Sequence, residues 1–218
     1  MNRIYILLSI GFLILMTGCS INTATKSSAF PKIYKEKPVN ILFLPPINLS
    51  TAPEAKEYFS STLSETASET GYYFLPMEVT SPFLQSEGLY DTEIIGDNVL
   101  PQFKEHFDAD AVLITKILEW DKAYYVLGGN VTVSLDFMLR STVSGDTLWN
   151  YNGRIVYDTS GSNDNLLVSL IETAIQTAAQ DYIPIAKEVN RRVFITAPKG
   201  PYHPRFDLDG EDTIIQKP

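Results

Sequence analysis

The chain has 218 residues, with 17 Lys and Arg against 26 Asp and Glu, and therefore a formal charge of −9 at pH 7. An apolar fraction of 44% and a charged fraction of 20% exclude a disordered chain, and the length favours one folded domain. The acidic balance argues against a nucleic-acid-binding protein, and a single cysteine leaves no internal disulfide or cysteine-based zinc cluster.

The first residues of the chain have the pattern of an export signal. Met1–Arg3 carries one positive charge, and the apolar run Ile4–Met16 follows it directly. That run has about 13 residues, whereas a helix needs roughly 20 to cross a bilayer. It is typical of the apolar region of a secretory signal peptide, which is removed after export.

The signal region ends in Leu15–Cys19, which resembles a bacterial lipobox with Met16 where leucine is commonest. This resemblance implies cleavage between Gly18 and Cys19 and lipidation of Cys19. Ser20 follows the cysteine, which in enterobacteria-like sorting implies an outer-membrane anchor with the domain in the periplasm. A plain signal peptide with an incidental cysteine, or an N-terminal membrane anchor, is the alternative.

These patterns divide the chain into four parts. They are a signal peptide (1–18), a lipidated polar tether (19–37), an α/β domain (38–196) and an extended acidic C-terminal tail (197–218). A flexible tether of this length has a root-mean-square reach of roughly 20–25 Å. The domain is therefore expected to stand just off the membrane.

The first half of the domain reads as strand, helix and strand. The apolar run Val39–Leu44 predicts a buried strand, and Tyr72–Leu75 predicts a second one. Thr51 is the expected cap of a helix over Pro53–Thr70, with Gly71 just beyond its end. This order predicts a β–α–β unit. Two shorter helices are expected over Ser81–Leu89 and Asn98–Phe107.

The second half predicts a sheet followed by helices. Ala111–Trp120 has the apolar character of a central strand, while Val131–Leu139 alternates strictly and pairs with Thr147–Tyr157 as an antiparallel hairpin. A long helix is expected over Asn165–Tyr182, capped by Asp164, and a shorter one from Pro184 to Phe194. The fold class is α/β, one domain with a mixed β-sheet and flanking helices.

No recognised catalytic pattern occurs in the sequence. It contains no Gly-x-Ser-x-Gly, no His-Glu-x-x-His and no glycine-rich phosphate loop, and its two histidines are His106 and His203. The acidic run Asp207–Asp212 is typical of a solvated segment, with weak divalent-cation binding as the alternative. We therefore expect no enzyme, no catalytic residues, no metal site and no cofactor.

Aromatic residues suggest where a partner binds. They make up 11% of the chain, and several stand close together on the expected strands. Such residues occur both in cores and at protein interfaces. The candidate interface residues are Trp149, Tyr151, Tyr124 and Tyr125, with a place in the core as the alternative.

Several short motifs occur together with the order and spacing of a known family. The motifs are Ile41–Ser50, Gly71–Pro76, Ala109–Leu113, Ile117–Trp120 with Tyr124, and Gly200–Pro204. In these motifs the mature chain resembles a family of bacterial lipoproteins of unknown function that includes a meningococcal surface antigen candidate. The resemblance implies an α/β domain similar to the N-terminal domain of TolB and to curli-secretion lipoproteins. It also implies a homodimer, and it carries no catalytic residues.

The sequence therefore predicts a non-enzymatic outer-membrane lipoprotein that is a scaffold or accessory subunit of an envelope or secretion assembly. Its expected partners are the membrane, through the lipid on Cys19, a second copy of the chain, and envelope proteins. The main alternative is a peptidoglycan-linked or small-ligand binding module that regulates a cell-wall enzyme. A periplasmic hydrolase that uses carboxylates alone is a third possibility.

Overall fold

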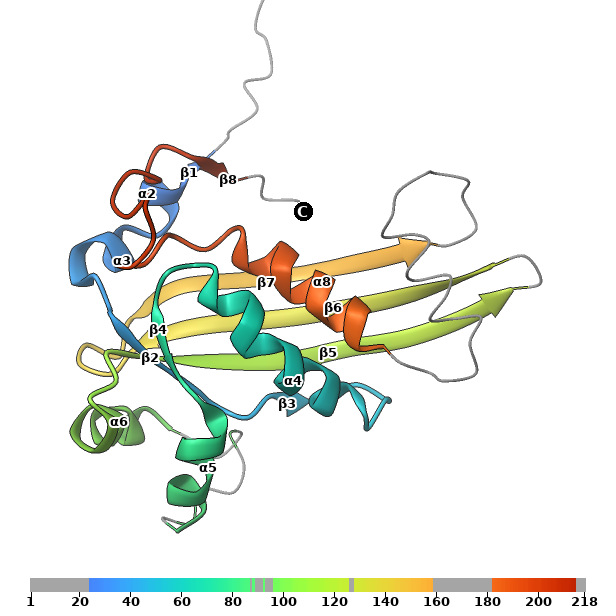
Figure 1. The fold of residues 1–218 in the computed structure, drawn as a ribbon, viewed down its shortest axis with the longest axis horizontal. Helices are drawn as coiled ribbons and strands as arrows, with labels where there is room; N and C mark the ends of the chain where they lie inside the picture. The colour runs from blue at the N-terminus through green and yellow to red at the C-terminus, as the bar shows by residue number, and fades with distance from the viewer. Residues whose placement is uncertain are drawn as a thin grey trace, which may run out of the picture.

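The computed structural model describes residues 24–86, 88, 92, 96–125, 128–158 and 182–214 (Figure 1). The predicted signal peptide, Gly18 and Cys19 therefore lie outside the described residues. So do Asp164 and all but the last residue of the helix predicted over Asn165–Tyr182.

The described elements form a mixed sheet with helices on both faces. The strands are β1 (Ala24–Thr25), β2 (Asn40–Phe43), β3 (Ile47–Asn48), β4 (Tyr73–Leu75), β5 (Ala111–Tyr125), β6 (Gly128–Ser141), β7 (Thr147–Asp158) and β8 (Thr213–Ile214). The helices are α2 (Lys26–Ala29), α3 (Pro31–Glu36), α4 (Ala55–Ser68), α5 (Met77–Ser86), η2 (Asp97–Val99), α6 (Leu100–Phe107) and α8 (Ile183–Phe194).

The main sheet has the strand order β4-β2-β5-β6-β7, and β3 adds to one end of β5. The short strand β2 runs parallel to both β4 and β5, whereas β5, β6 and β7 are antiparallel. The expected β–α–β unit is therefore present as β2–α4–β4, and the predicted mixed α/β fold is confirmed.

The strands β5 to β7 are long and continue beyond the apolar run that predicted the first of them. The β5–β6 register shifts between Ile117 and Glu119, and pairing continues to Tyr125. Leu118 stands at this irregularity and is partly exposed, while Trp120 returns to the buried face. A bulge resets the alternation in this way. The prediction ended the strand at Trp120 because the charged residues Asp121 and Lys122 follow it, whereas pairing with β6 continues through them.

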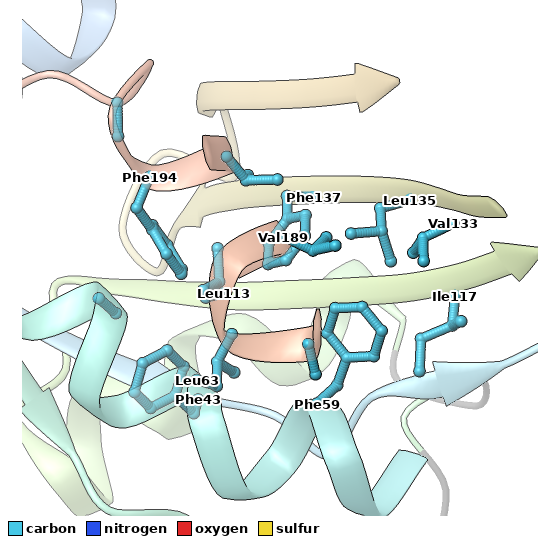
Figure 2. Close-up of a cluster of buried hydrophobic side chains, with 14 of the residues drawn as sticks. Phe43, Phe59, Leu63, Leu113, Ile117, Val133, Leu135, Phe137, Val189 and Phe194 are labelled. Atoms are coloured by element: carbon cyan, nitrogen blue, oxygen red, sulfur yellow. The ribbon is translucent and has the colours of Figure 1, made fainter. Parts of the chain in front are cut away.

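Helices α4 and α8 cover one face of the sheet and form the main core with it (Figures 1 and 2). In α4, Phe59 and Leu63 lie four residues apart on one apolar stripe and point at the strands. Val189 of α8 packs beside Phe137 of β6. Burying a side chain of this size contributes about 1.5–3 kcal/mol, so this layer dominates the stability of the fold.

The beginning of α4 differs from the prediction. The helix begins at Ala55 and its N-cap is Glu54, with no side-chain hydrogen bond from a cap. Asn48 forms the turn before it, since its amide donates to the Ala52 carbonyl at 2.8 Å and its oxygen accepts from the Ser50 amide at 3.1 Å. This Asx-type turn occupies the residues before the helix, and the predicted cap at Thr51 is wrong.

Helices α5 and α6 lie on the opposite face and cover only the parallel part of the sheet. They form a second cluster in which Leu84, Leu100 and Phe103 pack against Leu42 and Val112. The remaining part of this face, on β5, β6 and β7, carries mainly polar side chains, as the alternation of β6 predicted. Thr132 is buried there, and Val156 of β7 is an exposed apolar residue of the same face.

Residues 24–37 and 197–214 are folded where an extended tether and tail were expected. From Ala24 onward the predicted tether forms β1, α2 and α3, and β1 pairs with β8 near the C-terminus. We call residues 24–37 and 197–214 together the terminal clamp (Figure 1). The two predictions are wrong for these residues because buried polar contacts, described below, fix both segments to the domain.

Candidate functional site

Trp149 does not form the predicted interface. Its side chain is only 2% exposed and packs between Phe137 and Phe194, with ring centroids 6.3 and 6.1 Å away. This face of β7 is the one that α8 covers, so Trp149 belongs to the core. Tyr151 lies on the same face and is half-buried, and burial raises the pKa of its hydroxyl.

Tyr124 and Tyr125 end strand β5, where they pair with Gly129 and Gly128 of β6. Their side chains lie outside what the structure describes. The interface assignment therefore stays a prediction for these two residues.

The other face of β5–β7 has a different chemistry. Pairing places Lys116, Asp136 and Asn152 in one row across three strands, and Glu119, Ser134 and Arg154 in the next. Arg154 donates two hydrogen bonds to the Glu119 carboxylate, at 2.9 and 3.0 Å, and thereby bridges over β6. We call these six residues the polar sheet face.

Sequence reasoning identified the alternation that creates this face but not its members as candidates. The sequence pattern that could have identified them is the set of polar residues that alternate with the apolar residues of β6, such as Ser134 and Asp136. What alternation could not show was which polar residues of β5 and β7 align with them, because the bulge near Leu118 changes the register.

A buried ion pair holds the terminal clamp together. The Lys26 ammonium lies 3.2 Å from the Asp209 carboxylate, and both side chains are almost fully buried. Lys26 also donates to the Ala197 carbonyl at 2.9 Å. A buried charge needs such partners, because desolvation without them costs several kcal/mol.

Asp209 is the centre of this network. Besides Lys26 it accepts from the Lys199 backbone amide at 2.9 Å and from the Tyr34 hydroxyl at 3.1 Å. Burial and the adjacent Asp209 charge raise the pKa of Tyr34, so this hydroxyl remains a donor. One carboxylate thus joins α2, α3 and the C-terminal segment.

Two of the sequence motifs meet at the edge of the clamp. The Gly71 carbonyl accepts from the Tyr202 amide at 2.8 Å, and the Thr70 carbonyl accepts from the Gly200 amide at 2.8 Å. Gly71 has φ +82°, and a Cβ there would lie 2.4 Å from that of His203. The Tyr72 hydroxyl donates to the Pro198 carbonyl at 3.0 Å. The motifs Gly71–Pro76 and Gly200–Pro204 are therefore structural partners.

A hollow of about 340 Å³ lies between the C-terminal ends of α4 and α8 and the clamp. Glu69, Arg191, Lys199 and His203 are among the residues that line it. Burial and the charge of Lys26 lower the pKa of Lys199, and burial and the charge of Lys199 lower that of His203. A lowered pKa leaves His203 neutral at pH 7, and Arg191 is paired with Glu188 at 2.7 Å. Lys199 is therefore the cation of the hollow that faces the Glu69 carboxylate across it, and the lining is mixed in charge.

In the ranges that the structure describes, no group of three or more His, Cys, Asp and Glu side chains is placed to hold a metal ion. Among the same residues, no helix combines the length and the apolar character needed to cross a membrane.

Comparison with known proteins identifies relatives of the whole chain. The family model described as "Putative lipoprotein GNA1162-like" matches residues 29–196. A curated relative, "Putative lipoprotein NMB1124/NMB1162" of Neisseria meningitidis serogroup B, is 24% identical over 213 residues, which are 98% of each chain.

Two solved structures are among those that this chain resembles. The crystal structure of lipoprotein GNA1162 from Neisseria meningitidis matches with a TM-score of 0.52 and 25% identity, over 66% of this chain and all of the other. The PelC dodecamer from Paraburkholderia phytofirmans matches with a TM-score of 0.42 and 15% identity, over 72% of this chain and 86% of that one.

Proposed function

Because the chain belongs to the GNA1162-like lipoprotein family, we propose that it is a lipid-anchored, non-enzymatic protein of the bacterial outer membrane. Its α/β domain lies in the periplasm and acts as a scaffold or accessory subunit of an envelope or secretion assembly. The observation that carries this proposal is the polar sheet face, which is a regular, partly exposed surface on a rigid three-stranded support.

The family and the N-terminal sequence support the anchor. Leu15–Cys19 resembles a lipobox, and Cys19 is the single cysteine of the chain. Two or more acyl chains give stable membrane attachment, which a diacylglyceryl cysteine with an acylated amine provides.

The anchor is tested by metabolic labelling with a palmitate analogue. We expect the label on the wild-type chain and its loss, together with release from the membrane fraction, in Cys19→Ala. A labelled and membrane-bound Cys19→Ala variant would contradict the proposal. Ser20→Ala is the matched control, and it should keep both the label and the attachment.

The polar sheet face supports a protein partner. It carries both signs of charge in adjacent rows, with Lys116 and Arg154 beside Asp136 and Glu119. Mixed charges set the orientation and specificity of a partner more than the affinity. We expect this face to bind an envelope protein whose surface carries a complementary charge pattern. A second copy of the chain is the other candidate partner.

In-cell photo-crosslinking tests this surface. A photoreactive residue in place of Asn152, which is exposed on β7, should give adducts with another envelope protein. The control is the same residue in place of Lys187, which forms an exposed ion pair with Glu65 on the helical side. Adducts of the chain with itself alone would establish a dimer and contradict the accessory-subunit role, and equal adducts at both positions would contradict the assigned face.

The hollow beside the clamp favours a second candidate, a small-ligand or peptidoglycan-binding module that regulates a cell-wall enzyme. In this hollow Lys199 supplies a cation and His203 a neutral imidazole that donates a hydrogen bond, and the carboxylates of peptidoglycan accept from both kinds of group. Co-sedimentation with purified sacculi tests it. Binding that the double substitution Lys199→Gln and His203→Gln abolishes would favour this candidate over the scaffold.

A further inference from the structure

The C-terminal half of the clamp carries two strongly exposed apolar side chains. Tyr202 is 71% exposed and Leu208 is 70% exposed, although each belongs to a well-fastened turn. The Tyr202 amide donates to the Gly71 carbonyl at 2.8 Å, and the Leu208 amide donates to the Arg205 carbonyl at 3.0 Å. The backbone is thus held while both side chains extend into the surroundings.

We propose that the terminal clamp rests on the lipid bilayer and inserts Tyr202 and Leu208 into its interfacial layer. This inference rests on the proposed lipidation of Cys19. It specifies which surface of the domain contacts the membrane, and it makes the lipid itself one of the molecules that the folded domain binds.

The short connection between the lipid and the clamp supports this contact. Four residues separate Cys19 from Ala24, the first residue of β1, so the connection is five residue-to-residue steps long. Even a fully extended chain of this length spans at most about 18 Å. Since β1 pairs with β8, and Lys26 is held by Asp209, the clamp is the part of the domain that this connection keeps near the membrane.

The exposed side chains have the chemistry of the interface. Tyrosine is enriched at the level of the lipid headgroups, where its ring is partly desolvated and its hydroxyl stays hydrated. Leucine gains free energy on leaving water. Because the turns are already ordered, little conformational entropy is lost when these side chains insert.

Charge pairing within the clamp indicates what kind of contact this is. Lys37 pairs with Asp207, Arg205 pairs with Asp212, and Lys26 is buried against Asp209. With these charges neutralised locally, attraction to anionic lipids contributes little. The contact should therefore form on zwitterionic and on anionic bilayers alike, and salt should change it little.

The test uses the full acylated chain in vesicles of phosphatidylethanolamine and phosphatidylglycerol. Lipidation blocks the thiol of Cys19, so a cysteine introduced elsewhere is the single reactive thiol and accepts an environment-sensitive fluorophore. The variants are Tyr202→Cys and Leu208→Cys. The matched control is Leu49→Cys, an aliphatic residue that is 57% exposed and follows β3, which lies in the lower part of Figure 1 while β1 lies at the top.

We expect a blue shift at positions 202 and 208 and at least a twofold quenching by spin-labelled lipids, with neither change at position 49. If the protein is acylated but the fluorophores at positions 202 and 208 are not quenched, the membrane contact of the clamp is overturned, while the lipid anchor stands. A shift that grows with protein density but is not quenched by the lipids assigns the surface to a second copy and also overturns it. If mass spectrometry finds no acyl groups, the lipid anchor fails, and the inference fails with it.

Discussion

Single carboxylates fasten segments that are distant in the sequence. Asp110 accepts hydrogen bonds from the backbone amides of Val39 and Asn40 at 2.8 and 3.0 Å, and Lys104 donates to its other oxygen at 2.8 Å. Asp209 does the same for the terminal clamp. In both cases one side chain satisfies backbone or cationic donors that would otherwise be desolvated without a partner.

Substitution of Asp110 should make the stability less dependent on pH. Burial alone would raise the pKa of Asp110, but the Lys104 hydrogen bond and the two backbone amides outweigh it and lower the pKa below 3.8. This carboxylate therefore stabilises the fold at pH values above 3.8, and the stabilisation is lost as the pH falls through the lower folded value.

We expect Asp110→Asn to lower the free energy of unfolding by about 1–3 kcal/mol at pH 7. The difference from the wild type should shrink as the pH falls below 3.8, the ordinary value. Urea denaturation across this pH range measures both effects. A difference that stays constant down to the acid limit would show that the charge of Asp110 is not responsible.

The buried pair in the clamp predicts a much larger effect than a surface pair. Lys26→Met leaves Asp209 buried without its cation, and removing one partner of such a pair costs about 3–5 kcal/mol. The control Lys32→Met removes an exposed pair with Asp146 and should cost less than about 1 kcal/mol. Thermal denaturation compares the two, and equal losses would refute the assigned role of Lys26.

At the scale of the elements, periodicity explains most of what was predictable. The stripe of α4, the alternation of β6 and the hairpin to β7 each follow from residues close together in the chain. The same reasoning misplaced the beginning of α4, because the Asn48 turn competes with the Thr51 cap for the same few residues.

The interface prediction failed at Trp149 for a related reason. Its aromatic side chain fitted both a core and a protein surface, and only the placement of α8 over β7 decides between them. The clamp was unpredictable from local patterns, since Lys26 reads as a tether residue until Asp209, far along the chain, is placed beside it.

The contact between the two motifs at Gly71 gives a test at the element scale. Gly71→Ala combines a left-handed backbone with a clash against the Cβ and backbone of His203 at 2.4–2.8 Å. Gly145→Ala has a similar φ of +72°, but its nearest neighbour is an Arg140 nitrogen at 3.8 Å. The backbone cost, about 1–2 kcal/mol, is therefore common to both variants.

We expect Gly71→Ala to lower the free energy of unfolding by more than Gly145→Ala does, because only Gly71→Ala adds the clash with His203 to the shared backbone cost. The turn at Gly200–Pro204 should loosen first. Hydrogen exchange at the Tyr202 amide measures that loosening directly. Equal exchange in the two variants would contradict the idea that the close approach of these segments holds the clamp.

At the scale of the whole molecule, residues 24–37 and 197–214 form one structural unit on the domain. Antiparallel pairing sets Ala24 opposite Ile214 and Thr25 opposite Thr213. The C-terminal segment is therefore the support of the N-terminal one, and the region that follows the proposed lipid site depends on residues at the far end of the chain.

Removal of residues 197–218 tests this dependence. We expect the truncated chain to keep the main sheet, while residues 24–37 lose the carboxylate that satisfies Lys26 and become accessible to protease. Limited proteolysis with mass spectrometry locates the first cleavage. Protection of residues 24–37 equal to that in the full chain would show that the C-terminal segment is not their support.

The two charged residues of the buried pair in the clamp are synthesised at very different times. Lys26 and Asp209 are 183 residues apart, and a ribosome makes the chain from the N-terminus. For nearly the whole of synthesis, the segment beside Cys19 has no partner to dock on. Under the proposed lipidation of Cys19, the region around the cysteine is therefore made and exported long before Asp209 is available to hold Lys26 in place.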